Sequence, residues 1–267
     1  MGGLSMDQAF VQAPEHRAKP SVAEADGIPV IDLSPLFAAD GVDVDALAAE
    51  VGRASQDWGF FVVVRHGVPE EVVARAAEAQ RAFFALPPAR RAAVARSEAA
   101  QMGYYASDHT QNVRDWKEAF DLVPTRHPPP PPPAGVLDNK WPDDLPGFRS
   151  FGSLTSSSSS RRLVPHQILE QRSNGGVWSN DRYESAEHRV AMNVEKERFS
   201  MPFFFYPASY TMVEPLEEIV SEESPARYNP YCWGEFFSTR KNGDFKKLDV
   251  DNIQIAHFRK KALVHIQ

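Results

Sequence analysis

The chain has 267 residues, of which 42% are hydrophobic, and a formal net charge of −7. This length and apolar content allow one large domain or two smaller ones with a buried core, while the acidic balance argues against a general nucleic-acid-binding surface. The single cysteine excludes an internal disulfide framework and is typical of a reducing compartment.

The N-terminal segment, residues 1–27, is expected to be a disordered leader without the apolar stretch of a secretory signal. The sequence contains no apolar run long enough to span a bilayer. It therefore predicts a soluble, cytoplasmic protein with neither a nucleic-acid partner nor a membrane partner.

The first half of the chain alternates predicted strands and helices. Apolar residues at helical spacing and β-branched or aromatic runs mark them, with Pro69 suited to a helix start. Strands are expected over residues 28–33, 60–64 and 114–123, and helices over 45–58, 69–86 and 89–97. The six prolines Pro128–Pro133 form an extended stretch. We interpret this stretch as a surface loop rather than a docking ligand.

The composition changes abruptly at residues 150–176, which contain the serine run Ser156–Ser160 and have the character of a linker. Strand signals return at Val177. Beyond it we expect strands over 187–192 and 198–206, a helix over 231–241 with Trp233, Phe236 and Phe237 on one side, and a short element over 252–258.

Three polar residues of this last part could carry chemistry. Arg198 and Ser200 would share one face of a strand, because strand side chains alternate. A guanidinium can hold a carboxylate by two parallel hydrogen bonds, and a hydroxyl can add a third. A neutral imidazole such as that of His188 suits divalent iron. Without context, a lone histidine in a strand is more often a core or surface residue, and a lone arginine is more often a surface charge.

Two blocks together resemble the plant-type iron(II) and 2-oxoglutarate-dependent dioxygenases, which include flavonol synthases, flavanone hydroxylases and gibberellin oxidases. The first block runs from Ile28-Pro29-Val30-Ile31-Asp32-Leu33 through Trp58-Gly59-Phe60-Phe61 and His66-Gly67-Val68-Pro69 to Phe83-Phe84-Ala85-Leu86-Pro87. The second runs from Val177 to about Lys260 and includes Trp178–Val190 and Arg198-Phe199-Ser200.

The resemblance implies a double-stranded β-helix, or jelly roll. In that family a His-x-Asp pair and a later histidine hold iron, and an Arg-x-Ser pair holds the far carboxylate of 2-oxoglutarate. By resemblance, His188 matches the later metal ligand, and Arg198 and Ser200 match the pair that binds 2-oxoglutarate. Iron(II), 2-oxoglutarate, dioxygen and a small plant metabolite or hormone as substrate are implied in the same way. The sequence does not identify that substrate.

The His-x-Asp pair has no counterpart in the chain. The residues two positions after the eight histidines are Ala18, Val68, Gln111, Pro129, Ile168, Val190, Arg259 and Gln267. None of them is acidic. The resemblance therefore implies that His188 is the sole remaining ligand of the iron triad, and it implies no catalytic residue in this chain. A single imidazole holds iron(II) weakly, because affinity depends on several ligands fixed in geometry.

We therefore predict an α+β chain whose N-terminal helices pack on an incomplete jelly roll that lacks its central strands. The expected divisions are a leader (1–27), an N-terminal dioxygenase-like region (28–149), an atypical serine-rich linker (150–176), the end of the catalytic domain (177–260) and a tail (261–267). The abrupt junctions at Arg149 and Val177 fit an altered splice or a gene-model error better than gradual drift.

Three functions remain open on the sequence. The preferred hypothesis is a truncated family member without competent iron chemistry. The second is an active dioxygenase with a rebuilt site that uses His188, His166 and an acidic residue from elsewhere. The third is a non-catalytic binding or regulatory module.

Overall fold

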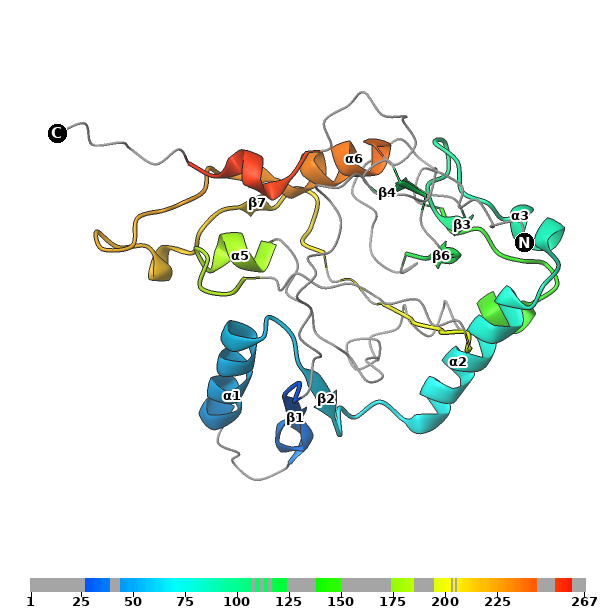
Figure 1. Ribbon diagram of the computed structural model, residues 1–267, viewed down its shortest axis with the longest axis horizontal. Coiled ribbons are helices and arrows are strands. Elements are labelled where there is room, and N and C mark those ends of the chain that lie inside the picture. Colours follow the sequence, from blue (N-terminus) through cyan, green and yellow to red (C-terminus); the bar gives the residue numbers. More distant parts are fainter. Residues whose placement is uncertain are drawn as a thin grey trace, which may run out of the picture.

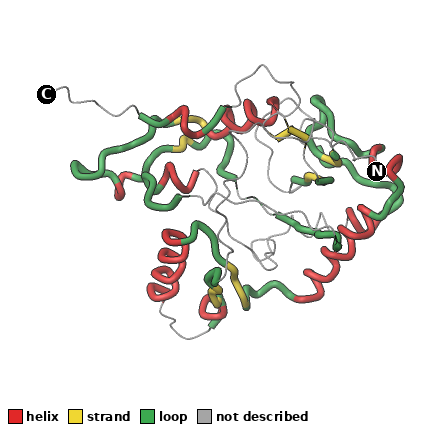
Figure 2. The backbone as a smooth tube through the Cα atoms, in the orientation of Figure 1, coloured by secondary structure: helices red, strands yellow, loops and turns green. Residues whose placement is uncertain are grey.

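A computed structural model gives the structure of the protein. It describes residues 27–38, 44–106, 109–110, 113–114, 117–123, 138–149, 174–184, 195–202, 204, 206–243 and 253–260. The elements fall into three groups, each with its own apolar cluster (Figure 1). Figure 2 shows that helices and loops make up most of this described backbone and that its strands are short.

The first group consists of two strands joined through a helix. Strand β1 (Val30–Asp32) pairs in parallel with β2 (Val62–Val64), and α1 (Val44–Asp57) connects them. Gly59 has a φ of 73°, a conformation that glycine adopts without strain, and there the chain turns from α1 towards β2. The buried residues of this cluster are Ile31, Leu47, Ala54, Phe61 and Val63. The predicted strands and helix of this region are confirmed, with somewhat shorter strands.

An ion pair between Arg65 and Asp32 links the C-terminal ends of β1 and β2. Arg65 Nε donates a hydrogen bond to Asp32 Oδ1 at 2.8 Å, and Arg65 Nη2 contacts Oδ2 of the same carboxylate. The backbone N–H of Ser34 donates to Asp32 Oδ1 at 2.9 Å. The hydrogen bonds from Arg65, followed by that from the Ser34 backbone, hold the pKa of the Asp32 carboxyl well below its usual range.

Acidification should therefore weaken this corner of the fold. A depressed folded-state pKa gives a stabilising contribution that is complete above the unfolded pKa of about 3.9 and is lost as the pH falls through the folded value. We expect Asp32→Asn to show a smaller fall in melting temperature between about pH 5 and pH 2 than the unchanged chain, because it has already lost this contribution. Asp57→Asn, at an exposed aspartate, is the control. Identical acid profiles for Asp32→Asn and the unchanged chain would contradict the expectation.

The second group is built on a long helix. Helix α2 (Glu70–Phe84) begins directly after Pro69 and is followed by α3 (Pro88–Ala92). Strand β3 (Gly103–Tyr105) pairs antiparallel with β6 (Ala119–Asp121), and β4 (His109–Thr110) pairs with β5 (Val113–Arg114). The cluster's buried residues are Phe83, Val94, Tyr104 and Phe148. The predicted helix over 69–86 is confirmed and the helix over 89–97 is shorter. Among the described residues of the strand expected over 114–123, Arg114 belongs to β5 and Ala119–Asp121 form β6.

The third group lies near the C-terminus. It contains α5 (Asn174–Trp178), β7 (Met212–Val213) paired antiparallel with β8 (Tyr231–Cys232), and α6 (Trp233–Gly243). Two short 3-10 helices, Glu217–Ile219 and Ile255–Phe258, complete it. Its buried residues are Val177, Val213, Tyr228, Tyr231, Trp233 and Phe236. The predicted helix over 231–241 is confirmed as α6, and the short element over 252–258 is the second 3-10 helix.

The structure of this region differs from the sequence expectations in two places. The strand signals that return at Val177 begin on a helix, because Val177 and Trp178 belong to α5, which starts at Asn174 inside the segment expected to be a linker. The strand expected over 198–206 is also not formed, because the described residues of that range have irregular backbone and pair with no described strand. An aromatic-rich sequence becomes a strand only where a neighbour completes its hydrogen bonds.

The described strands form four separate two-stranded sheets. Two-stranded sheets are marginal alone, so the apolar clusters must supply much of their stability. The strand expected over 187–192 and most of the segment 150–176 lie outside the described residues, so the missing central strands stay a prediction. Within the described ranges, no helix is long and apolar enough to cross a membrane.

Candidate functional site

Arg198 and Ser200 lie on an irregular segment that runs beside α2 (Figure 1). Gln80 Nε2, on α2, donates a hydrogen bond to the backbone carbonyl of Ser200 at 2.6 Å. The rings of Phe84 and Phe199 are 6.3 Å apart between centroids. The side chains of Arg198 and Ser200 are both exposed. The pair is therefore accessible to a ligand, while the backbone carbonyl of Ser200 is hydrogen-bonded to α2.

The expected metal ligand His188 lies outside the described residues, as does His166. The structure therefore does not place His188 relative to Arg198 and Ser200. Of the eight histidines, it describes the side chains of His66 and His257. Nδ1 of His66 accepts the backbone N–H of Val68 at 3.2 Å, and Nδ1 of His257 accepts that of Gln254 at 3.2 Å. These two nitrogens hold local turns and are not available to a metal.

The described residues do not fit an iron site. They include no group of three or more histidine, cysteine, aspartate or glutamate side chains arranged to hold a metal ion. An iron(II) centre of the oxygenase type needs two histidines and a carboxylate on one face.

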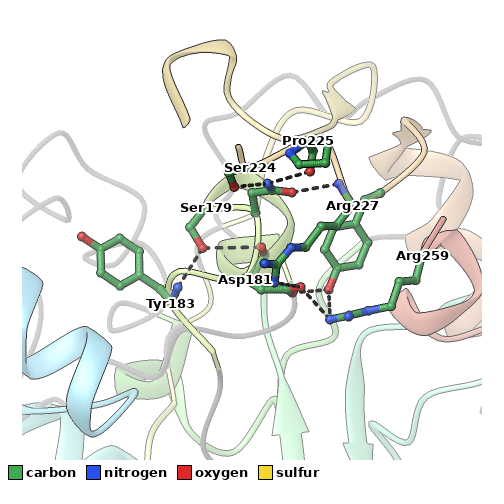
Figure 3. Close-up of polar contacts among 10 residues, drawn as sticks. Ser179, Asp181, Tyr183, Ser224, Pro225, Arg227 and Arg259 are labelled. Carbon is green, nitrogen blue, oxygen red and sulfur yellow. Dashed lines mark hydrogen bonds and ion pairs between the residues drawn. The ribbon is translucent and has the colours of Figure 1, made fainter. Parts of the chain in front are cut away.

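A polar network that sequence reasoning missed lies at a turn shortly before the segment with His188 (Figure 3). Its centre is Asp181, whose side chain is only 4% exposed. The carboxylate accepts hydrogen bonds from Arg259 Nη2 at 2.7 Å, Arg227 Nη1 at 3.2 Å and Tyr228 Oη at 2.5 Å. The three donors belong to two segments that are distant from Asp181 in sequence. Asp181 therefore binds both segments to the turn.

The neighbouring Asn180 extends the network. Its Nδ2 donates to Ser224 Oγ at 3.2 Å and to the carbonyl of Pro225 at 3.1 Å, and its Oδ1 accepts the N–H of Arg227 at 2.9 Å. Both polar atoms of this buried amide side chain thus bind protein partners. The network therefore stabilises the fold at the turn, and Asn180 has no polar atom left for a ligand.

The backbone at this turn explains the residue types. Asn180 and Asp181 have φ values of 52° and 69°, in the left-handed region. Asparagine and aspartate tolerate this region better than other residues with side chains. The adjacent Asn-Asp dipeptide is thus the signal from which the turn could have been predicted.

The contacts within the network shift the pKa values of Tyr228 and Arg259. Burial, followed by the hydrogen bond to Asp181, raises the pKa of Tyr228, so its hydroxyl keeps its proton and donates. The hydrogen bond to Tyr228 and the charge of Asp181 raise the pKa of Arg259. The side chain of Asp181 is therefore held by the guanidinium groups of Arg227 and Arg259 and by a phenol that keeps its proton.

Comparison with known proteins identifies the family. The model for the N-terminal region of a non-haem dioxygenase in morphine synthesis matches residues 28–144, and the model of the 2OG-Fe(II) oxygenase superfamily matches residues 143–207. The two matches follow one another along the chain. The chain belongs to the 2-oxoglutarate- and iron(II)-dependent oxygenase family. The resemblance read from its two sequence blocks is confirmed.

Similar members of this oxygenase family come from plants. Jasmonate-induced oxygenase 2 of Arabidopsis thaliana is 26% identical over 298 residues, covering 79% of this chain and 78% of the relative. Gibberellin 2-beta-dioxygenase 5 of Oryza sativa subsp. japonica is 25% identical over 284 residues, covering 78% of this chain and 81% of the relative.

The structure resembles solved oxygenases. The crystal structure of JOX2 in complex with 2OG, Fe and JA matches with a TM-score of 0.67 and 20% identity, covering 96% of this chain and 94% of the other. The fold is therefore that of the oxygenases, whose catalytic domain is a jelly roll. Iron(II) and 2-oxoglutarate are the cofactors of the family, and its members are oxidoreductases that act on small plant metabolites and hormones.

Proposed function

We propose that this chain is an oxygenase-family protein that lacks competent iron chemistry and keeps the carboxylate-binding half of the family's site. The carrying observation is the absence of any His-x-Asp or His-x-Glu sequence in the whole chain. By the resemblance, His188 is the single remaining ligand of the iron triad. One imidazole cannot fix a ferrous ion in the geometry that its chemistry needs.

The alignments with relatives support a missing internal segment. The match to jasmonate-induced oxygenase 2 spans 298 positions, more than the 267 residues of this chain, although it covers only 79% of the chain. Gaps in this chain must therefore face residues of the relative. The atypical segment 150–176 lies between the two oxygenase-like blocks, 28–149 and 177–260, and we propose that it replaces the middle of the catalytic domain, with 261–267 as a tail.

The retained half of the site consists of Arg198 and Ser200. Both side chains are exposed on the segment beside α2. The guanidinium can form two parallel hydrogen bonds with the far carboxylate of 2-oxoglutarate, and the hydroxyl can donate a third. The parent reaction would be the oxidation of a small molecule, and a cytoplasmic location stays a prediction from the sequence.

Iron and turnover measurements test the proposal. After incubation with iron(II) and 2-oxoglutarate without oxygen, followed by desalting, we expect far less than one iron per chain by elemental analysis, because two of the three ligands are missing. On admission of oxygen, succinate should form only at the rate of the protein-free control. Jasmonate-induced oxygenase 2, taken through the same steps, is the positive control for the assay.

One equivalent of tightly held iron, or succinate at ordinary enzyme rates, would overturn the proposal. In that case His188→Ala and His166→Ala separate the alternatives. Iron that is lost in both variants would establish a rebuilt site containing the two histidines. Iron retained in both would show that other groups hold it.

A further inference from the structure

One face of α2 contacts the segment that carries Arg198 and Ser200. Gln80 and Phe84 are four residues apart and therefore neighbours on the helix surface. Gln80 binds the carbonyl of Ser200, and Phe84 contacts the ring of Phe199. The helix thus contacts two consecutive residues of the Arg-x-Ser sequence, the side chain of Phe199 and the backbone carbonyl of Ser200. A hydrogen bond and an aromatic contact act together on a segment that has no strand partner among the described residues.

The same helix is anchored in the second apolar cluster, against which Phe84 also packs. Phe83 is 0% exposed. Its ring lies 4.7 Å from that of Phe120, 5.2 Å from that of Phe148 and 5.9 Å from that of Tyr104, measured between centroids. Tightly packed aromatic side chains move little. The cluster therefore holds α2 next to the point at which Phe84 contacts the segment.

We infer that α2 orients the proposed carboxylate-binding pair, and that Gln80 and Phe84 are its positioning residues. This inference rests on the proposed function of Arg198 and Ser200. Because Phe199 lies against α2 and the carbonyl of Ser200 is bound, the segment between Arg198 and Ser200 is held before a ligand arrives. Ordering a flexible segment costs free energy on binding, so a segment that is already ordered binds more tightly.

The inference is tested with two matched ligands. 2-Oxoglutarate and 2-oxopentanoate share a five-carbon 2-oxo acid frame, but only the first carries a second carboxylate. Titration calorimetry on the full chain gives both dissociation constants. Their ratio measures the contribution of the second carboxylate to binding. A variant that merely unfolds part of the protein lowers both apparent affinities equally and leaves the ratio unchanged.

Gln80→Leu removes the donor and keeps a helix-forming side chain of similar size. We expect it to lower the preference for 2-oxoglutarate by about twofold to tenfold, the range of one neutral hydrogen bond. Gln80→Lys restores a donor and should recover the preference. Glu78→Leu is the control, because Glu78 is exposed on the same helix. Arg198→Ala removes the charged hydrogen bonds themselves and should lower the preference about tenfold or more.

The outcomes separate the inference from the function on which it rests. If Arg198→Ala loses the preference while Gln80→Leu keeps it, the positioning role of Gln80 is overturned and the proposed function stands. If the unchanged chain shows no Arg198-dependent preference for 2-oxoglutarate over 2-oxopentanoate, both the inference and the proposed function are overturned. Loss in Gln80→Leu with recovery in Gln80→Lys supports the inference.

Discussion

Replacement of Phe83 by alanine is expected to destabilise the second group of elements by about 3–5 kcal/mol, the usual cost of truncating a fully buried phenylalanine. The ring is completely buried among Phe120, Phe148 and Tyr104. Its removal leaves a cavity bounded by rings whose edge-to-face and stacked contacts cannot all be rebuilt. Because the three apolar clusters are separate, the loss should be local.

Hydrogen exchange measured by mass spectrometry can detect this locality, since it reports the free energy of opening segment by segment. In Phe83→Ala, amides of β3 and β6 should exchange much faster, while those of α5 and α6 should change little. Phe83→Leu should cost less because it keeps part of the volume. Leu36→Ala, at a side chain that is 51% exposed, is the surface control. Faster exchange spread equally over all three groups would show that the clusters unfold as one unit.

The N-terminal half was largely predictable because its signals are local. Periodic apolar residues and the proline at position 69 place α1 and α2 to within a few residues, and the run over 60–64 contains β2. Val63 is buried against Ile31 at the position that the parallel register requires. Helices and short buried strands of this kind depend mainly on the sequence that forms them.

The C-terminal half was less predictable because its conformation depends on distant partners. The segment Arg198–Tyr206 has a strand-like composition, yet its described residues pair with no strand, and Gln80, more than a hundred positions earlier, holds it. The carboxylate of Asp181 likewise finds its partners at Arg227 and Arg259. Residue patterns indicate which side chains can bind a carboxylate, but they do not show which part of the chain will hold those side chains in place.

Replacement of Asp181 by alanine is expected to destabilise the third group by about 2–3 kcal/mol, because it leaves several charge-assisted hydrogen bonds without their acceptor. The side chains of Arg227 and Arg259 are about half exposed, at 52% and 50%. Water can therefore replace part of the hydrogen bonding that they lose with the Asp181 carboxylate. The cost should therefore lie below that of a fully buried ion pair. Residues 224–228 and 258–260 should show the largest increase in hydrogen exchange, since Asp181 fastens both segments.

Asp181→Asn separates charge from backbone conformation. Asparagine tolerates the φ of 69° at this position and keeps one acceptor oxygen, so this variant should lose less stability than Asp181→Ala. Asp57→Ala, at an exposed aspartate, controls for loss of a surface charge. Because the carboxylate is nearly inaccessible, added salt should screen its contacts much less than those of an exposed pair. Asp181→Ala could instead match Asp57→Ala in stability and in hydrogen exchange at both segments. That result would show that the polar network does not hold the turn against the C-terminal residues. The apolar contacts of Val177 and Tyr228 within the third cluster would then have to hold them together.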